Sequence, residues 1–494
     1  MSSIKTLKKV KDEFDKLLGQ ADVLVSSEES CASIERSLLR SLLNIGKLLL
    51  QYIIEMKSEE LKGKEPLEGK LGKLKNKGKS VRKYLSLFGT LEISRVGYWQ
   101  VGLGKYYPLD EDLELSSTHH WSYALRELVS ETASEQDYRA SVQILNKLLG
   151  LKLTGKSSSR NAEATGIWVD KYYAEQKNCS EVAEGSCFSL SVDGKGVPMI
   201  PKERDKLPKK GKRLGKGEKN GIKKMATVVV SSSFTPKRRT SNAIIKGLMN
   251  SPLSKIEAES LKDNNDKGEN DNRWHKGIHA RAFLGEQKKA IDYGLKNIKR
   301  RMTAASQFVV PIDAGVGLEP HIIQSVKEHG LEQQFQGIIL DIIHVSEYVW
   351  EVANSVLGEK SKLRHRWVCD VLKDILNSNT QKVIDDFRRI RDKTKISSNA
   401  EKKITKAITY FSNHIHKMDY KHYIDKGFPV SSALVEAKCG HLVKDRMELS
   451  GMRWSHKGAQ AILDLRAVSI NGHIEHFMQA VPKFERKNFI RKAA

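Results

Sequence analysis

The sequence predicts an α/β core that is interrupted by an all-α segment and preceded by a mainly α-helical region. Four short apolar segments with the composition of strands follow residue 184. Residues 121–176 and about 345–425 instead carry helical patterns. Three of the four strand segments run directly into an aspartate, so the pattern predicts a sheet that gathers carboxylates near its strand ends.

The composition favours an anionic partner. The chain has 494 residues, and 85 Lys and Arg stand against 60 Asp and Glu, which gives a net charge of +25. Nucleic acid is the first candidate for neutralising this excess, and an anionic membrane surface is the second. The most apolar run, residues 37–56, contains Arg40 and Lys47 and falls short of a spanning helix. We therefore expect DNA as partner and no membrane.

Cysteine usage and the N-terminus point to the cytoplasm. The five cysteines form no Cys-x-x-Cys pair, which argues against a disulfide framework or a cysteine zinc site. The first residues, MSSIKTLKKVKDEFDKLL, are charged and lack the apolar core of a signal peptide. We expect a cytoplasmic, nucleoid-associated protein.

Residues 1–84 are expected to hold N-terminal helices and a basic linker. Apolar residues of the segment 30–56 recur on one helical face, which fits either a core helix or a self-association helix. Residues 57–83 are rich in Lys, Gly and Glu and predict a flexible linker. A small β-hairpin is expected after residue 85.

Residues 85–180 contain a candidate helix-turn-helix. The stretch "YRASVQILNKLLG" ends at Gly150, and "LKLTGKSSSRNAEATG" re-enters a helix after a short turn. Such a pair is either a DNA-reading motif or an ordinary helical hairpin. Under the first interpretation, Ser158, Arg160 and Asn161 would contact DNA from the start of the second helix.

Asp193, Asp313 and Asp341 each follow a strand segment, in "SVDGKG", "VVPIDAG" and "GIILDIIH". In an open α/β sheet the strand ends converge on one crevice. Carboxylates gathered there repel one another unless a divalent cation neutralises them. Oxygen ligands suit Mg²⁺ or Mn²⁺, and two such ions can support phosphoryl transfer. A turn-forming role explains any single Asp as simply.

Four stretches then carry a family resemblance: "SVDGKGV", "ILDIIHVSEYVWEVANSVLG", the helix-turn-helix segment, and "LVEAKCGHLVKDRMELSGMRWSHKGAQAILDLRA". Over about residues 85–480 the chain resembles the DDE transposases with an RNase H-like catalytic domain, most closely the ISKra-type insertion-sequence transposases. The resemblance implies an RNase H-like core in residues 181–344 and 426–494. The 123 positions from Asp313 to Glu436 imply that residues 345–425 are an all-α insertion.

The resemblance also implies a site. Asp193, Asp313 and Glu436 would be the catalytic acids and would hold two Mg²⁺ or Mn²⁺ ions. Asp341 and His344 match an Asp-x-x-His motif, which implies local architecture and contacts to the DNA end rather than metal ligation. Basic and aromatic residues after Glu436 are candidates for DNA contacts, or else form a solvated helix face and core packing: Lys438, Lys444, Arg446, Arg453, Trp454 and Lys457.

The implied function is a DNA transposase that binds terminal inverted repeats, cleaves a strand and transfers it to target DNA. Synapsis of two DNA ends implies a homodimer or a higher oligomer on DNA. Two alternatives remain open at this point. One is a catalytically inactive, transposase-derived DNA-binding protein, and the other is an RNase H-like, structure-specific nuclease.

Overall fold

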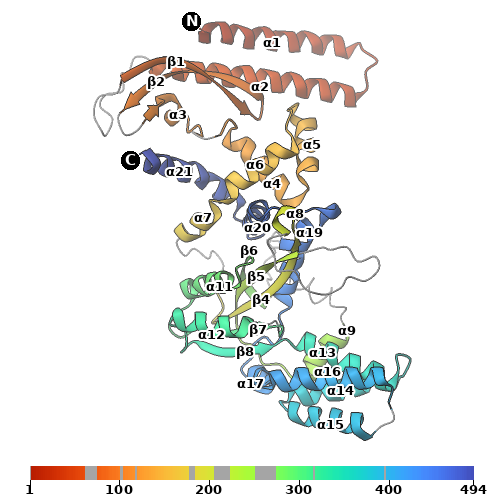
Figure 1. The fold of residues 1–494 in the computed structure, drawn as a ribbon. Coiled ribbons are helices and arrows are strands. Elements are labelled where there is room, and N and C mark those ends of the chain that lie inside the picture. The colour runs from red at the N-terminus through yellow and green to blue at the C-terminus, as the bar shows by residue number, and fades with distance from the viewer. Residues whose placement is uncertain are drawn as a thin grey trace. The chain divides into compact units, whose positions relative to one another are not determined.

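The structure is a computed structural model that divides into two compact units (Figure 1), Met1–Glu175 with Gly472–Ala494, and Gln176–Asn471. It describes residues 2–61, 75–100, 104–116, 119–176, 184–204, 223–250, 274–314, 317–393 and 396–493. None of the helices within these ranges is both long and apolar enough to span a membrane.

The second unit is built around a mixed five-stranded sheet. Its strands are β4 (Cys187–Pro198), β5 (Lys223–Phe234), β6 (His275–Leu284), β7 (Gln307–Ile312) and β8 (Phe335–Leu340). They lie in the order β6-β5-β4-β7-β8. β4, β5 and β6 pair antiparallel, while β7 pairs parallel with both β4 and β8. The antiparallel and parallel halves of the sheet therefore meet at β4.

The strand register brings three aspartates to one level. Val192 pairs with Ile312, and Ile312 pairs with Leu340. The next residues along these three neighbouring strands are Asp193, Asp313 and Asp341. Because adjacent strands lie about 4.8 Å apart, the carboxylates start from neighbouring backbone positions.

The prediction that each of these acids ends a strand is confirmed for Asp313 and Asp341 and wrong for Asp193. β4 continues to Pro198, since β5 goes on pairing with it where β7 has already ended. Asp193 itself pairs with Val228. It therefore projects from the interior of a strand, on a stiffer segment of backbone than a turn provides.

The sequence missed strand β6. Residues up to 278 read as a polar loop and residues from 281 as a helix, whereas β6 spans both and the helix begins at Gln287. His279 and Arg281 break the apolar pattern, yet both are buried. His279 is 2.7 Å from the Tyr293 hydroxyl, and Arg281 pairs with Asp464, so each polar group has a partner.

Helices pack against the sheet. α11 (Gln287–Arg301) and α12 (Leu318–Glu328) share an apolar cluster with Leu190 and Val192 of β4. Side chains alternate between the faces of a strand, so Asp193 points to the opposite face from Val192. α18 (Ala433–Cys439) packs on β4 and β5, and α20 (His456–Ile470) packs on β6. α18 is thereby placed to bring Glu436 to the acids.

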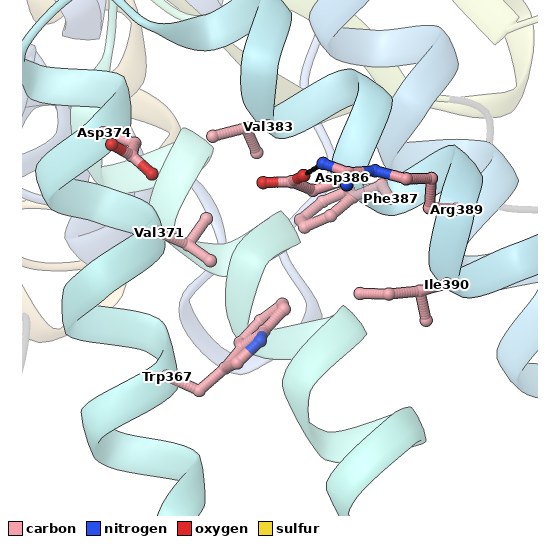
Figure 2. Close-up of a pocket in the computed structure, with 8 residues that line it drawn as sticks. All are labelled: Trp367, Val371, Asp374, Val383, Asp386, Phe387, Arg389 and Ile390. Carbon is pink, nitrogen blue, oxygen red and sulfur yellow. Dashed lines mark hydrogen bonds and ion pairs between the residues drawn. The ribbon is translucent and has the colours of Figure 1, made fainter. Parts of the chain in front are cut away.

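The segment predicted to be all-α is helical. Its helices are α13 (Ile342–Leu357), α14 (Leu363–Leu376), α15 (Thr380–Lys393), α16 (Ser398–His414), η1 (Ile415–Lys417) and α17 (Tyr420–Asp425). They share one apolar cluster with α9 (Ser241–Asn250) and with β7 and β8. A hollow of about 320 Å³ lies between α14 and α15, and Figure 2 draws the side chains that line it. Trp367 and Phe387 stack there, with ring centroids 5.9 Å apart. None of the predicted site acids lines it.

Short elements complete the second unit: α8 (Pro201–Arg204), the π-helical turn η2 (Gly440–Lys444), α19 (Asp445–Met447) and η3 (Leu449–Gly451).

The first unit combines helices with an antiparallel three-stranded sheet. Its elements are α1 (Ser2–Val25), α2 (Cys31–Leu61), β1 (Lys75–Ser86), β2 (Gly89–Gln100), β3 (Gly104–Tyr106), α3 (Pro108–Asp112), α4 (Tyr123–Glu135), α5 (Tyr138–Leu149), α6 (Gly155–Gly166), α7 (Val169–Glu175) and α21 (Ile474–Ala493). The segment predicted to be a linker is helix at its start and strand β1 at its end, and residues 62–74 lie outside the described ranges. The β1–β2 hairpin therefore begins about ten residues earlier than expected.

Candidate active site

Glu436 comes to the sheet on a short helix with small, buried neighbours. Ala433 and Ala437 are buried, and their size allows α18 to lie close to β4 and β5. Ser432 precedes the helix, and its backbone carbonyl accepts from the Glu436 N–H at 3.4 Å. Glu436 is therefore carried to the sheet by α18.

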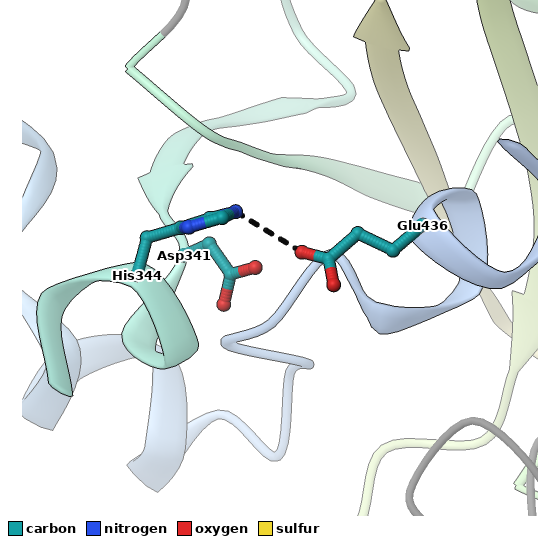
Figure 3. A group of neighbouring side chains, drawn as sticks. All are labelled: Asp341, His344 and Glu436. Carbon is teal, nitrogen blue, oxygen red and sulfur yellow. Dashed lines mark ion pairs between the residues drawn. The ribbon is translucent and has the colours of Figure 1, made fainter. Parts of the chain in front are cut away.

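Figure 3 shows the tightest group of potential ligands, which are Asp341, His344 and Glu436. One ligand atom from each lies within 4.8 Å of the others. His344 Nε2 is 3.1 Å from Glu436 Oε1 and 4.0 Å from Asp313 Oδ2. His344 therefore lies between two of the predicted catalytic acids, and three predicted site residues, Asp313, Asp341 and Glu436, surround its ring.

Asp193 belongs to the same electrostatic neighbourhood. Burial raises the pKa of Asp193, and the charges of Glu436 and Asp313 raise it further. The Gly194 N–H donates to Asp193 Oδ1 at 2.6 Å, and a hydrogen bond with the Cys439 thiol also favours the carboxylate. Glu436 and Asp313 are thus close enough to Asp193 for their charges to raise its pKa. Asp193 and Asp313 nevertheless lie outside the tightest group.

Asp341 joins two helices at the edge of the site. It is fully buried, and burial raises its pKa to about 7. Asp341 Oδ1 accepts from the Ile343 N–H at 2.8 Å as the N-cap of α13, and Oδ2 accepts from the Ser432 hydroxyl at 2.5 Å. The Asp341 carboxylate therefore connects the start of α13, which carries His344, to Ser432, which precedes the helix that carries Glu436.

The His344 imidazole is the cation of the group. Its hydrogen bond with Glu436, together with the charges of Asp341 and Asp313, raises the pKa of His344 to about 10. The same bond lowers the pKa of Glu436. At neutral pH the ring is positive and Glu436 is ionised. The Tyr410 hydroxyl adds a donor 3.4 Å from Asp313 Oδ1.

The donor set fits a hard divalent cation. Carboxylate oxygens from four different elements converge here, and such oxygens suit Mg²⁺ and Mn²⁺. Asp341 is buried, and its two oxygens already accept hydrogen bonds from Ser432 and from the N-terminus of α13. They are therefore less available to bind a metal ion than the oxygens of its neighbours. Glu436 belongs both to the predicted ligand set and to the tightest group.

Two predicted DNA contacts of the helix-turn-helix region are wrong. α5 and α6 do form the predicted helix pair, but Ser158 and Asn161 are buried between helices. Ser158 Oγ lies 3.4 Å from Ser141 Oγ. Asn161 donates to the Arg126 carbonyl at 3.1 Å and accepts from Arg126 Nε at 3.3 Å. Both side chains hold the helices together and do not face solvent.

Arg446 and Trp454 are also buried, so their predicted DNA contacts are wrong as well. The Arg446 guanidinium lies 4.9 Å from the centre of the Trp454 ring, and Trp454 Nε1 donates to the Met447 carbonyl at 2.9 Å. The Trp454 backbone bonds to the end of β4, with its N–H 3.0 Å from the Pro198 carbonyl. Core packing, the alternative for Trp454, is the correct interpretation.

The other predicted DNA contacts stay predictions. Arg160, Lys444, Arg453 and Lys457 are exposed, and Lys438 is partly exposed. Exposure leaves these side chains accessible to a phosphate backbone.

Sequence reasoning missed three residues that shape the site. Ser432 and Cys439 lie within the motif around Glu436, but a serine or a cysteine in a sequence does not by itself predict a hydrogen bond to a carboxylate. Tyr410 comes from α16, which is nearly a hundred positions from Asp313 in the chain. No local pattern could have joined them.

The comparisons with known proteins add little. No family model matches the chain, and no curated protein matches its sequence. Among solved structures, the Drosophila P element transposase strand transfer complex is similar with a TM-score of 0.33 and 8% identity, over 72% of this chain and 94% of that one. A TM-score this low does not establish a shared fold.

Proposed function

We propose that this chain is a metal-dependent DNA transposase that cleaves a strand at the ends of a DNA element and joins it to target DNA. The observation that supports the proposal is the strand register, which brings Asp193 and Asp313 to one level of the sheet. The charges of Glu436 and Asp313 also raise the pKa of Asp193, as expected for acids that lie near one another.

The sheet supports an RNase H-like core for this proposal. The register places Asp193 and Asp313 at one level on neighbouring parallel strands. A long helical segment separates them in the chain from Glu436 on α18. This is the arrangement implied by a core that is interrupted by an all-α insertion.

The acids would hold two Mg²⁺ or Mn²⁺ ions, through Asp193, Asp313 and Glu436. When bound, such ions lower the pKa of a water and neutralise charge that develops on the phosphate. His344 and Asp341 are assigned to positioning. His344 bonds to Glu436 and lies beside Asp313, and Asp341 anchors the two segments that carry His344 and Glu436.

Exposed basic residues would bind the DNA. Arg160 of α6 is assigned to the terminal inverted repeats, and Lys444, Arg453 and Lys457 to phosphates near the site. The net charge of +25 supports a polyanionic partner. A residue that binds phosphate should make the affinity depend on salt.

The test uses labelled duplexes that carry the DNA flanking the gene, with a supercoiled plasmid as target. We expect nicking at the element end and joined product, in Mg²⁺ or Mn²⁺ but not in EDTA. Asp193→Asn and Glu436→Gln should each lower both rates by about 10³-fold or more, because each removes an acid that anchors charge in the transition state. Glu359→Gln, at an exposed position in the same unit, is the matched control.

Three results separate the proposal from its rivals. Cleavage without joined product would indicate a nuclease. Salt-dependent binding of the ends with no cleavage in either metal would indicate an inactive DNA-binding protein. Cleavage that survives both Asp193→Asn and Glu436→Gln would refute the assigned site.

A further inference from the structure

The N-terminal helices α1 and α2 contact each other through polar groups. Ser3 donates to Glu59 at 2.7 Å, Thr6 donates to Glu55 at 2.8 Å, and Asn44 donates to Glu13 at 3.3 Å. These pairs run in opposite directions along the two helices, so the helices form an antiparallel hairpin. Partly buried apolar side chains, such as Val10 and Leu17 of α1, share the helical face of these polar groups.

A second set of apolar side chains on the hairpin is exposed. α1 buries only Ser3 and Thr6, and along α2, all of whose residues are described, only Ile54 is buried. Side chains that are 43% to 89% exposed form a stripe on each helix: Ile4, Phe14, Leu18 and Val25 on α1, and Leu39, Leu42, Leu49, Ile53 and Met56 on α2. Their spacings of three, four, seven or about ten residues keep each stripe on one helical face.

Both stripes face the same side of the hairpin. At about 100° per residue, the α2 stripe is centred about 95° from the mean direction of Leu50 and Ile54, which pack on the three-stranded sheet. The α1 stripe lies about 100° from the line of Ser3 and Thr6. Because the helices run antiparallel, these rotations turn both stripes away from the sheet. The hairpin thus presents one two-helix apolar layer.

We propose that a second copy of this chain docks on this apolar layer, so that two hairpins form a four-helix bundle. Taking roughly 150–200 Å² for a fully exposed side chain of this size, the nine residues expose about 700–1,000 Å². A stable interface needs about 800 Å² from each partner. The area of the layer therefore matches what a two-fold dimer requires.

The shape of the layer also suits a copy of itself. The stripes are about 32 Å and about 26 Å long, so each can pack along its full length on a like-sized helix. The charged residues between Leu39 and Met56 in the sequence lie on other faces of α2, so the stripe itself is uncharged. A dimer through this layer does not depend on DNA, metal or the proposed chemistry. If the proposed function holds, the dimer supplies the two active sites that joining two DNA ends requires.

Sedimentation of the full chain tests the proposal, in high salt without DNA or metal. We expect a mass twice 55.7 kDa for the wild-type chain. Leu42→Lys combined with Leu49→Lys should give a monomer, with the dissociation constant raised at least 100-fold. Leu363→Lys is the control, because it makes the same kind of exchange once, at an α14 position that is 67% exposed. Circular dichroism checks that helix content is retained.

Should the lysine pair lose helix content, Leu42→Ala with Leu49→Ala provides the second readout. It leaves the hairpin apolar and should raise the dissociation constant at least tenfold. The proposal is overturned if the wild-type chain is a monomer at about 50 μM, where mass action favours assembly. It is also overturned if the lysine pair stays dimeric with its helices intact, or if Leu363→Lys dissociates the dimer equally.

Discussion

Asp341 should make the stability of the second unit fall as pH rises. Its pKa is about 7 in the folded chain and 3.8 for an ordinary aspartate, because burial disfavours the charged form. The folded state therefore holds a proton between about pH 4 and pH 7 that the unfolded state has lost. By linkage, stability falls as pH rises through this window. Three pKa units correspond to about 4 kcal/mol, and this net shift already includes Ser432 and His344, which stabilise the charged form.

Asp341→Asn should remove this slope. The amide stays neutral at every pH, and it can keep the bond from the Ile343 N–H that caps α13. We expect the free energy of unfolding to fall by roughly 2–4 kcal/mol more in the wild-type chain than in the variant between pH 4.5 and pH 7. Asp193 and His344, whose pKa values are also raised, titrate in both chains and cancel in this difference.

The assay is urea unfolding of the full chain in EDTA, followed by tryptophan fluorescence, at several pH values. Asp370→Asn serves as the control, since it makes the same exchange at an exposed position of α14. Parallel stability–pH curves for the wild-type chain and Asp341→Asn would refute the buried, proton-holding state of this carboxyl.

Three further outcomes follow from the contacts. Arg126→Met should destabilise the first unit by about 3–5 kcal/mol in thermal unfolding, because it removes the guanidinium 2.8 Å from the buried Glu485 carboxylate and leaves that charge with the Ser116 and Tyr123 hydroxyls and with His119; an unchanged melting temperature would contradict this. Arg160→Ala should lower the slope of log affinity against log salt by about one in a DNA titration and leave the melting temperature unchanged. Gly294→Ala should destabilise the second unit in urea by about 1–3 kcal/mol, since the added carbon would lie 2.4 Å from a Leu190 methyl; a neutral effect would show that the α11–β4 packing is looser than described.

The sequence predicted the elements whose patterns are local. The helical segment from 345 to 425 and the strands before Asp313 and Asp341 follow from periodicity and apolar runs. Strand β6 was missed because His279 and Arg281 are buried through partners in other elements, Tyr293 and Asp464. A residue pattern cannot show a partner that only the fold supplies.

The candidate site was predictable in its residue types more than in its roles. Acids that follow apolar segments could be found from the sequence, but the fixed link between Asp341 and Ser432 could not. The predicted DNA contacts of Asn161 and Arg446 are wrong, because both polar side chains are buried. Burial of a polar side chain depends on packing between helices, which spacing along one helix does not reveal.

Diffraction from crystals grown with Mn²⁺ is the sharpest test that the three acids bind metal, because manganese can be located by its anomalous signal. We expect Mn²⁺ bound by carboxylate oxygens of Asp193, Asp313 and Glu436, at the roughly 2.0–2.2 Å typical of such small divalent ions. Manganese bound by other residues, or a saturating soak that leaves these three acids without metal, would contradict it.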